Sequence, residues 1–390
     1  MDIVLTDAQQ MLKASARSFF QDACPKELVR QMETDDRGYP PELWRQMADL
    51  GWLAWPFPSR YGGADGNFFD LALLVEALGY AAAPTPFFSA IVLAGRLMLE
   101  AGTAAQKREL LPGIATGQTL LSLAYLEEDG DPEGASQGVT ACQTANGFTL
   151  RGTKSFVPAA HAADQLLCVA RTRPGRSASR GLSLFRLSPQ DAAVHLRPMR
   201  TVAGSQQFDV TLSEAAIGQE SLVGRLHGAG LPLQRTLLSA TALKCAEMVG
   251  GAQAALDLTV DYTKQRVQFG RPIGAFQAVQ HHCADMYRDL EMGRLLAYQA
   301  CWLLSEGADA RAAVSAAKLK LSRLYPAITQ LAHQVTGGVG YYTEYPLELY
   351  TRRALAAANA FGGVDYHAAR LAQTLWGKQA EGLQITHPAL

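Results

Sequence analysis

The sequence has no excess of charge of either sign and no long apolar run. Its 390 residues carry 35 Lys and Arg against 36 Asp and Glu, so the net charge is −1. A chain without a basic excess lacks the electrostatic basis for binding nucleic acid. Nowhere do about 18 apolar residues follow one another, so we expect no membrane span. The first residues, MDIVLTDAQQMLK, have no basic stretch before an apolar one, and no secretory signal is expected.

Cysteine is also scarce. Six cysteines occur in the chain and none forms a CxxC pair, which excludes a disulfide scaffold and a zinc ribbon. A reducing, cytoplasmic compartment fits this usage. The chain is 48 % hydrophobic and 18 % charged, as in ordinary globular proteins, so long disordered regions are not expected. The length allows two or three domains.

Apolar periodicity predicts helices in the first part of the chain, residues 1–118. Thr6 is placed to cap a first helix that runs through Met11, Ala16 and Phe19. Further helices are expected at 41–51, 69–79, 88–101 and 104–111. We expect residues 1–118 to form a helical domain.

The pattern changes near residue 119 to short strand-like runs separated by turns, at 120–125, 148–151, 165–170, 182–187 and 207–212. Asn146-Gly147 between two such stretches is a hairpin signal. The long helical crossovers of a parallel sheet are absent. Residues 119–226 are therefore expected to form an antiparallel β domain, a sandwich or barrel that ends near Gly224.

Long helices are expected again in residues 227–390, at 229–265, 276–304, 309–336 and 365–378, with Asp309 as an N-cap. Helices of about 30 residues joined by short loops form bundles. The fold class is therefore α+β: an N-terminal α-helical domain, a middle antiparallel β domain and a C-terminal four-helix bundle.

Two short patterns match known functional motifs, but the residues around them favour other interpretations. The run GASQG at 134–138 matches the serine-hydrolase pattern, with Ser136 as nucleophile, but acidic turn residues precede it instead of a buried strand. His281, His282 and Asp285 lie within one helical turn and would suit a metal, although no third cluster of ligands is near in the sequence. A solvated loop and a helix-surface pair are the favoured interpretations.

Two other segments have the chemistry of nucleotide binding. Arg266 and Arg271 can hold phosphate, and Phe269 offers a ring for stacking, although a basic helix end is the simpler alternative. Gly337 and Gly338 permit close backbone approach to a flat or anionic group, or form a plain helix C-cap.

The run RVQFGRPI at 266–273 and the run QVTGGVGYYTEYP at 334–346 resemble two signatures of the flavin-dependent acyl-CoA dehydrogenase family, in the same order. LGW at 50–52 and YGG at 61–63 resemble its N-terminal domain. The resemblance covers nearly the whole chain and implies FAD at a subunit interface. The residues that it implies meet the FAD of a neighbouring subunit are Arg266, Gln268, Phe269, Gln334, Gly337 and Gly338.

In that family a carboxylate removes a proton from Cα of an acyl-CoA thioester while Cβ gives a hydride to the flavin. The last loop, where most members have the glutamate, reads Phe361-Gly362-Gly363 here, and the alternative position is Ala240. The flavin pocket differs too. Phe156 can still cover the flavin ring, whereas Pro158, where the family has Thr or Ser, offers neither hydroxyl nor N–H.

Three interpretations follow. In the first, the base has moved to Asp365, with His367 as the next candidate, although Asp365 is also placed to N-cap the last helix. In the second, the chain resembles the subunit without a base of a heteromeric bacterial acyl-CoA dehydrogenase. In the third, it has altered flavin chemistry or is a structural subunit without catalysis. We favour the first two, a functional dehydrogenase or subunit.

The resemblance also implies partners. They are the acyl-CoA substrate, further subunits in a homo- or hetero-oligomeric dimer of dimers, and an electron-transferring flavoprotein.

Overall fold

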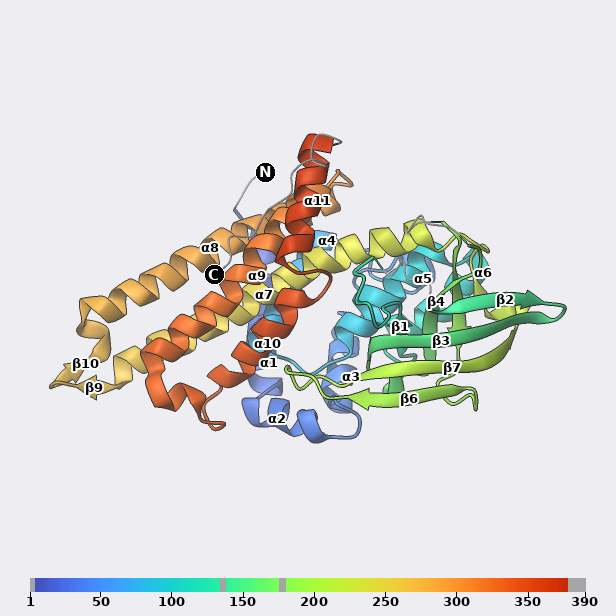
Figure 1. Ribbon diagram of the computed structural model, residues 1–390. Coiled ribbons are helices and arrows are strands. Elements are labelled where there is room, and N and C mark those ends of the chain that lie inside the picture. The colour runs from blue at the N-terminus through green and yellow to red at the C-terminus, as the bar shows by residue number, and fades with distance from the viewer. Residues whose placement is uncertain (1–3, 134–137, 175–179, 378–390) are drawn as a thin grey trace.

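A computed structural model describes residues 4–133, 138–174 and 180–377 (Figure 1). Thr6 caps the first helix as expected, in a capping box with Gln9. The short helix at 26–34 is not expected from the sequence, and the expected helix at 88–101 is π-helical in its first half. The N-terminal helices are α1 (Asp7–Ala23), α2 (Lys26–Thr34), α3 (Pro41–Asp49), α4 (Phe68–Ala81), η2 (Phe88–Gly95), α5 (Arg96–Ala101) and α6 (Ala104–Ala115).

The middle part is one sheet, in the order β6-β7-β3-β2-β4-β5-β8, with β1 beside β4. The pairs are antiparallel apart from β1–β4, and a single bridge joins β2 to β4 in parallel. The hairpin signal is confirmed, because β2 and β3 pair directly around Ala145 and Asn146. The strands are β1 (Leu121–Ala124), β2 (Thr140–Thr144), β3 (Gly147–Pro158), β4 (Gln165–Arg171), β5 (Leu182–Leu187), β6 (Val194–Met199), β7 (Gln207–Gly218) and β8 (Leu222–Val223).

The third part contains the four helices that the sequence predicts, α7, α8, α9 and α11, and one more that it does not, α10. The helices are α7 (Gly230–Gln265), α8 (Gln277–Ser305), α9 (Arg311–Thr336), α10 (Leu347–Asn359) and α11 (Val364–Trp376). A small hairpin of β9 (Val267–Gln268) and β10 (Arg271–Pro272) joins α7 to α8. The helices α7 to α10 pack on one another, and α11 packs on α9.

Two expected helix caps are wrong. The N-cap of α9 is Ala310, and Asp309 lies one residue earlier, where its carboxylate accepts a hydrogen bond from the Arg311 N–H at 3.1 Å. The N-cap of α11 is Gly363, and Asp365 lies inside the first turn instead. From these positions the aspartate carboxylates interact favourably with the positive end of the helix dipole, although they do not form the caps.

A buried carboxylate joins the N-terminal helices to the bundle. Glu76 on α4 accepts a hydrogen bond from the Tyr298 hydroxyl at 2.6 Å and pairs with Arg294, both on α8. Lys13 on α1 lies 3.0 Å from the same carboxylate. Because Glu76 is 4 % exposed, its charge requires these partners. In the described part of the chain, no helix is long and apolar enough to cross a membrane.

Candidate functional site

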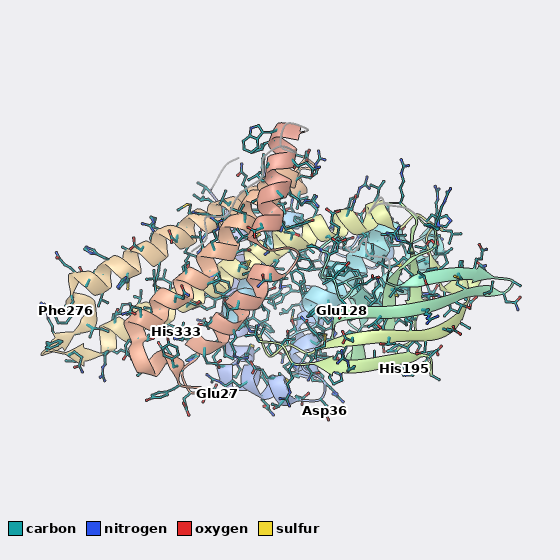
Figure 2. All side chains as sticks on the ribbon, in the orientation of Figure 1. Glu27, Asp36, Glu128, His195, Phe276 and His333 are labelled. Carbon is teal, nitrogen blue, oxygen red and sulfur yellow. The ribbon has the colours of Figure 1, made fainter. Side chains whose placement is uncertain are left out.

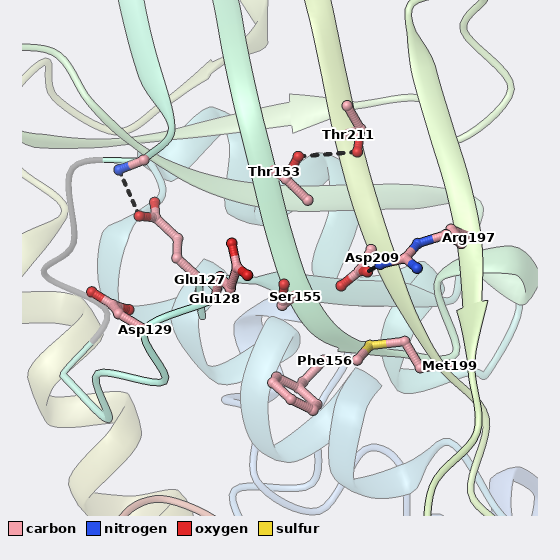
Figure 3. A pocket seen from close by; sticks show the side chains of 11 residues that line it. Glu127, Glu128, Asp129, Thr153, Ser155, Phe156, Arg197, Met199, Asp209 and Thr211 are labelled. Atoms are coloured by element: carbon pink, nitrogen blue, oxygen red, sulfur yellow. Dashed lines mark hydrogen bonds and ion pairs between the residues drawn. The ribbon is translucent and has the colours of Figure 1, made fainter.

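The β domain carries a groove of about 930 Å³ on the outer face of β3, β6 and β7, closed on one side by the loop after β1 (Figure 3). Hydroxyl and carboxylate side chains dominate its walls. It is lined by Glu127, Glu128, Asp129, Gly138, Thr153, Ser155, Phe156, Arg197, Met199, Asp209 and Thr211.

Phe156 is the aromatic ring of the groove. The β3–β7 register shifts between Lys154 and Val157, and Phe156 sits in this irregularity with φ at 56°. Because of this irregularity the Phe156 side chain is not covered by the sheet, and the residue is 44 % exposed. Exposed aromatic rings on a groove wall suit stacking against a flat ligand ring. The structure places Phe156 on the groove wall, and its role at a flavin ring stays a prediction.

Pro158 closes β3 two residues later and pairs with Gln207 of β7. Its carbonyl accepts a hydrogen bond from the Ser122 hydroxyl of β1. Proline donates no backbone hydrogen bond, so at this end of β3 a ligand can receive one only from another residue.

A buried ion pair fixes the loop side of the groove. Lys154 lies 2.7 Å from the Glu127 carboxylate and also donates to the Tyr125 carbonyl at 3.1 Å. The backbone N–H groups of Gly138 and Val139 donate to the same carboxylate at 2.6 and 2.9 Å. Because three donors hold the Glu127 carboxylate, Glu127 is a structural anchor and no free base.

The opposite wall holds a second pair, which the sequence analysis missed. Arg197 on β6 pairs with Asp209 on β7, opposite it in the register. Asp209 is 5 % exposed, whereas the Arg197 side chain is 80 % exposed and faces the groove. Beside them the hydroxyls of Thr153 and Thr211 lie 3.0 Å apart. The alternation of strand residues could have placed these side chains on one face, had β6 been recognised.

The loop between α10 and α11 carries Phe361, where the resemblance places a glutamate in most members. The Phe361 ring packs on Phe88 with centroids 5.7 Å apart. Ala240, at the alternative position, is fully buried in α7. Neither position brings a carboxylate to the site.

The two other candidates for a base lie on α11. Asp365 is exposed in the first turn. The His367 ring is buried, with Nε2 3.0 Å from the Phe361 carbonyl, and burial lowers its pKa to about 4, so the ring is neutral near pH 7. A neutral ring at this distance donates from Nε2 to that carbonyl.

Helix α11 is tied to the loop that borders the groove. Arg370 and Tyr366 contact the Glu133 carboxylate at 2.6 and 3.2 Å. The Arg370 guanidinium also donates to the Tyr366 hydroxyl at 2.7 Å. Helix α11 therefore links the loop between α10 and α11 to the loop that borders the groove.

The residues of the two sequence signatures lie at the opposite end of the molecule. Helix α7 begins against the sheet, where the Ala229 N–H donates to the Leu182 carbonyl at 3.0 Å. Its 36 residues, at 1.5 Å each, span roughly 54 Å before Arg266. Figure 1 shows the β9–β10 hairpin at the end remote from the sheet. Arg266 cannot reach the groove of its own chain.

The second signature packs on the end of α7 that leads into the first signature. The Tyr345 hydroxyl donates to the Leu258 carbonyl of α7 at 2.9 Å, and the rings of Tyr262 and Tyr345 lie 6.2 Å apart. Figure 2 shows Phe276 and His333 on this side of the molecule and Glu128 and His195 on the other. The signature residues are all exposed, Phe269 at 92 %: Arg266, Gln268, Phe269, Gln334, Gly337 and Gly338.

The alternative motifs find no support. Ser136 lies outside the described residues. His281 is exposed, and Asp285 pairs with Arg288 at 2.8 Å on the surface of α8. Within residues 4–133, 138–174 and 180–377, no three histidine, cysteine or acidic side chains gather as metal ligands. The helix-surface interpretation of His281, His282 and Asp285 is the one that remains.

The molecule thus combines a helical domain, a β domain with a groove and an exposed aromatic ring, and a helical bundle with an exposed basic hairpin. The acyl-CoA dehydrogenase N-terminal domain model matches residues 6–118, and the C-terminal domain model matches residues 228–375. The chain belongs to the acyl-CoA dehydrogenase family.

Individual relatives agree over nearly the whole length. The short-chain-specific acyl-CoA dehydrogenase of Megasphaera elsdenii is 30 % identical over 366 residues, 91 % of this chain and 94 % of that protein. The FAD complex of PigA has a TM-score of 0.90 at 25 % identity and covers 97 % of this chain and 100 % of that one. The ChsE4–ChsE5 complex of Mycobacterium tuberculosis has a TM-score of 0.86 at 26 % identity, with 96 % and 99 % covered. FAD is the cofactor of this family.

Proposed function

We propose that this protein is an FAD-dependent acyl-CoA dehydrogenase subunit, which acts on the Cα–Cβ bond of an acyl-CoA thioester. FAD, when bound, supplies the oxidising power by taking a hydride from Cβ. The observation that carries the proposal is that the two sets of residues that the resemblance assigns to FAD lie at opposite ends of the chain. The groove with Phe156 lies at one end, and the exposed signature residues lie roughly 54 Å away along α7.

Such a division requires a second subunit. The groove presents Phe156 for stacking but only Arg197 as an exposed guanidinium, and that group is paired with Asp209. A dinucleotide also needs donors for its pyrophosphate. Arg266 and Gln268, with the amides of Gly337 and Gly338, are the donors that we propose one subunit lends to its neighbour. Phe269 would cover the adenine half.

The groove fits a cofactor of this kind in chemistry. Phe156 offers a flat apolar face, and the Thr153, Ser155 and Thr211 hydroxyls offer hydrogen bonds along the strand face. The resemblance places Pro158 where the family has a hydroxyl near the flavin, so a hydrogen bond to the ring edge has to come from another residue. We propose that Phe156 orients the ring and Pro158 contacts it without a hydrogen bond.

The proton acceptor is the missing element. The resemblance places the family's carboxylate at Phe361 or at Ala240, and both side chains are apolar. Asp365 is the carboxylate nearest to Phe361 in the sequence, but it lies exposed in the first turn of α11. We propose that the base comes from a second family chain in a heteromer, as the similarity to the ChsE4–ChsE5 complex favours.

The remaining family features follow as proposals. We propose a dimer of dimers with FAD at the interface, reoxidised by an electron-transferring flavoprotein, and a cytoplasmic location. We also retain the division of the chain into residues 1–118, 119–226 and 227–390. Since the Megasphaera elsdenii relative is specific for short chains, butyryl-CoA is the first substrate to test.

Replacing Asp365 by asparagine tests the source of the base. If the base belongs to a partner chain, D365N should leave the rate of flavin reduction by butyryl-CoA in the assembled protein within about two-fold of the parent, since loss of a catalytic base costs about 10²–10⁴-fold. Anaerobic stopped-flow absorbance of the flavin measures the rate. A loss of about 100-fold or more with FAD still bound would make Asp365 the base and remove the need for a partner.

A further inference from the structure

The loop between α10 and α11 is held by a buried lysine that no sequence motif singled out. Lys318 lies in the middle of α9 with no exposed surface. Its ammonium group donates to the Ser322 hydroxyl at 2.8 Å, the Ala358 carbonyl at 2.9 Å and the Gly362 carbonyl at 3.0 Å. An ammonium has three donors, so all three are used.

The contacts of Lys318 fall on both sides of a strained turn. Ala358 lies in the last turn of α10, where the helix carbonyls lose their partners, and Gly362 lies just before α11. Within this turn, Phe361 has φ at 59° and Gly362 itself has φ at 97°. A positive φ is costly for phenylalanine, so the surroundings must hold it there. Lys318 supplies a charged donor at this point.

The conformation of this turn determines where the side chains of the loop between α10 and α11 point. Its backbone angle directs the Phe361 ring onto Phe88. From the next turn, α11 reaches the loop beside the groove through Tyr366, Arg370 and Glu133. A shift of the loop would therefore move both the side chain at the family's base position and one border of the groove.

We propose that Lys318 is a positioning residue, which clamps the backbone of residues 358–362 through its ammonium group and releases it on deprotonation. Its relevance to catalysis rests on the proposed function, but the clamp itself does not. A neutral amine has two N–H donors and one lone pair, so it cannot serve three acceptors. The Ser322 hydroxyl already donates to the Ala358 carbonyl at 3.0 Å. Loss of the proton therefore breaks one of the three contacts of Lys318 or the bond between Ser322 and Ala358, and either change loosens the clamp.

The charges around Lys318 place this change in an accessible pH range. Cys245 and Lys244 face it from α7, and His367 faces it from α11. Burial lowers the pKa of Lys318 to about 8, and the charge of Lys244 lowers it further. Burial raises the pKa of the Cys245 thiol to about 12, so Cys245 is uncharged in this range. The His367 ring is neutral at this pH and adds no charge. The clamp should be closed at pH 7 and largely open at pH 9.

Amide hydrogen exchange of the full chain tests the clamp without requiring activity. The reporters are the amides of Gly362 and His367, which bond to the Asn359 and Gly363 carbonyls. In K318M, exchange of these amides at pH 7 should be about ten-fold faster than in the parent, since a buried charged hydrogen bond is lost. The matched control is K320M, which makes the same change on α9 two residues away.

The pH profile separates a clamp from simple packing. After correction for intrinsic rates, protection in the parent should fall between pH 7 and pH 9, with a midpoint near 8. In K318M the protection should be low and flat over this range. If K318M does not fold, S322A, which removes one acceptor, should still shift the midpoint. Protection that is the same in K318M and K320M, or that stays constant in the parent up to pH 9, would overturn the proposal.

Amide exchange and flavin reduction together distinguish a failure of the clamp from a failure of the proposed function. A chain that shows the pH-dependent protection but whose flavin no acyl-CoA reduces would retain the clamp and lose the proposed function. A chain reduced by butyryl-CoA with pH-independent protection would show the reverse.

Discussion

Replacing Lys154 by methionine is expected to lower the free energy of unfolding by about 3–5 kcal/mol, because it strands a buried carboxylate. Glu127 is 5 % exposed and Lys154 1 %, and their charged atoms lie 2.7 Å apart. The backbone donors of Gly138 and Val139 remain in K154M but cannot neutralise the charge. Urea unfolding followed by far-UV circular dichroism measures the loss.

Two further variants make this prediction specific. The exposed pair of Lys264 and Asp261, 3.3 Å apart, provides the matched control K264M, which should change the stability little. The double variant K154M with E127Q removes both charges and should regain part of the loss. A K154M protein as stable as K264M would show that the pair does not anchor the groove.

The second large effect concerns FAD. In the assembly that carries the cofactor, R266A should weaken FAD binding by roughly 10- to 100-fold, the range expected for loss of a charge-assisted hydrogen bond. The guanidinium of Arg266 is exposed at the remote end of the bundle, where it is available to a neighbouring subunit. Release of FAD on dilution, followed by flavin fluorescence, measures the change.

Arg271 in the same hairpin is the matched control. Its guanidinium lies 4.2 Å from the ring centroid of Phe276 in its own chain, so it has a local role. R271A should retain FAD more tightly than R266A. If both variants release FAD equally, or if R266A keeps full occupancy, the role that the resemblance implies for Arg266 is wrong.

The long elements of the fold could be predicted from the sequence because their signals are repetitive. Helices α7, α8 and α9 show apolar residues at three- and four-residue spacing over several turns. Helices α2 and α10 begin after Pro25 and Pro346 without a side-chain cap, so the start of neither was recognised. The caps at Asp309 and Asp365 were predicted from residue type, and in each case the backbone enters the helix near but not at the aspartate.

The site could be predicted only where it is contiguous in sequence. The two signatures carried Arg266 and Gln334 by resemblance, and Phe156 entered through its resemblance to the family's residues beside the flavin. Lys154 and Glu127 are 27 residues apart on different elements, and no local pattern joins them. Lys318 meets backbone carbonyls 40 and 44 residues further on, which carry no signature of their own. Contacts of this kind arise from tertiary packing alone.

The central claim is that this chain completes an FAD site only together with another family chain. The most direct test is the FAD content, by absorbance and protein assay, of the chain purified alone and co-purified with a family chain that carries the catalytic glutamate. We expect the chain alone to be colourless or nearly so, and the co-purified assembly to be yellow and bleached by butyryl-CoA. A yellow chain that butyryl-CoA reduces when purified alone would contradict the claim.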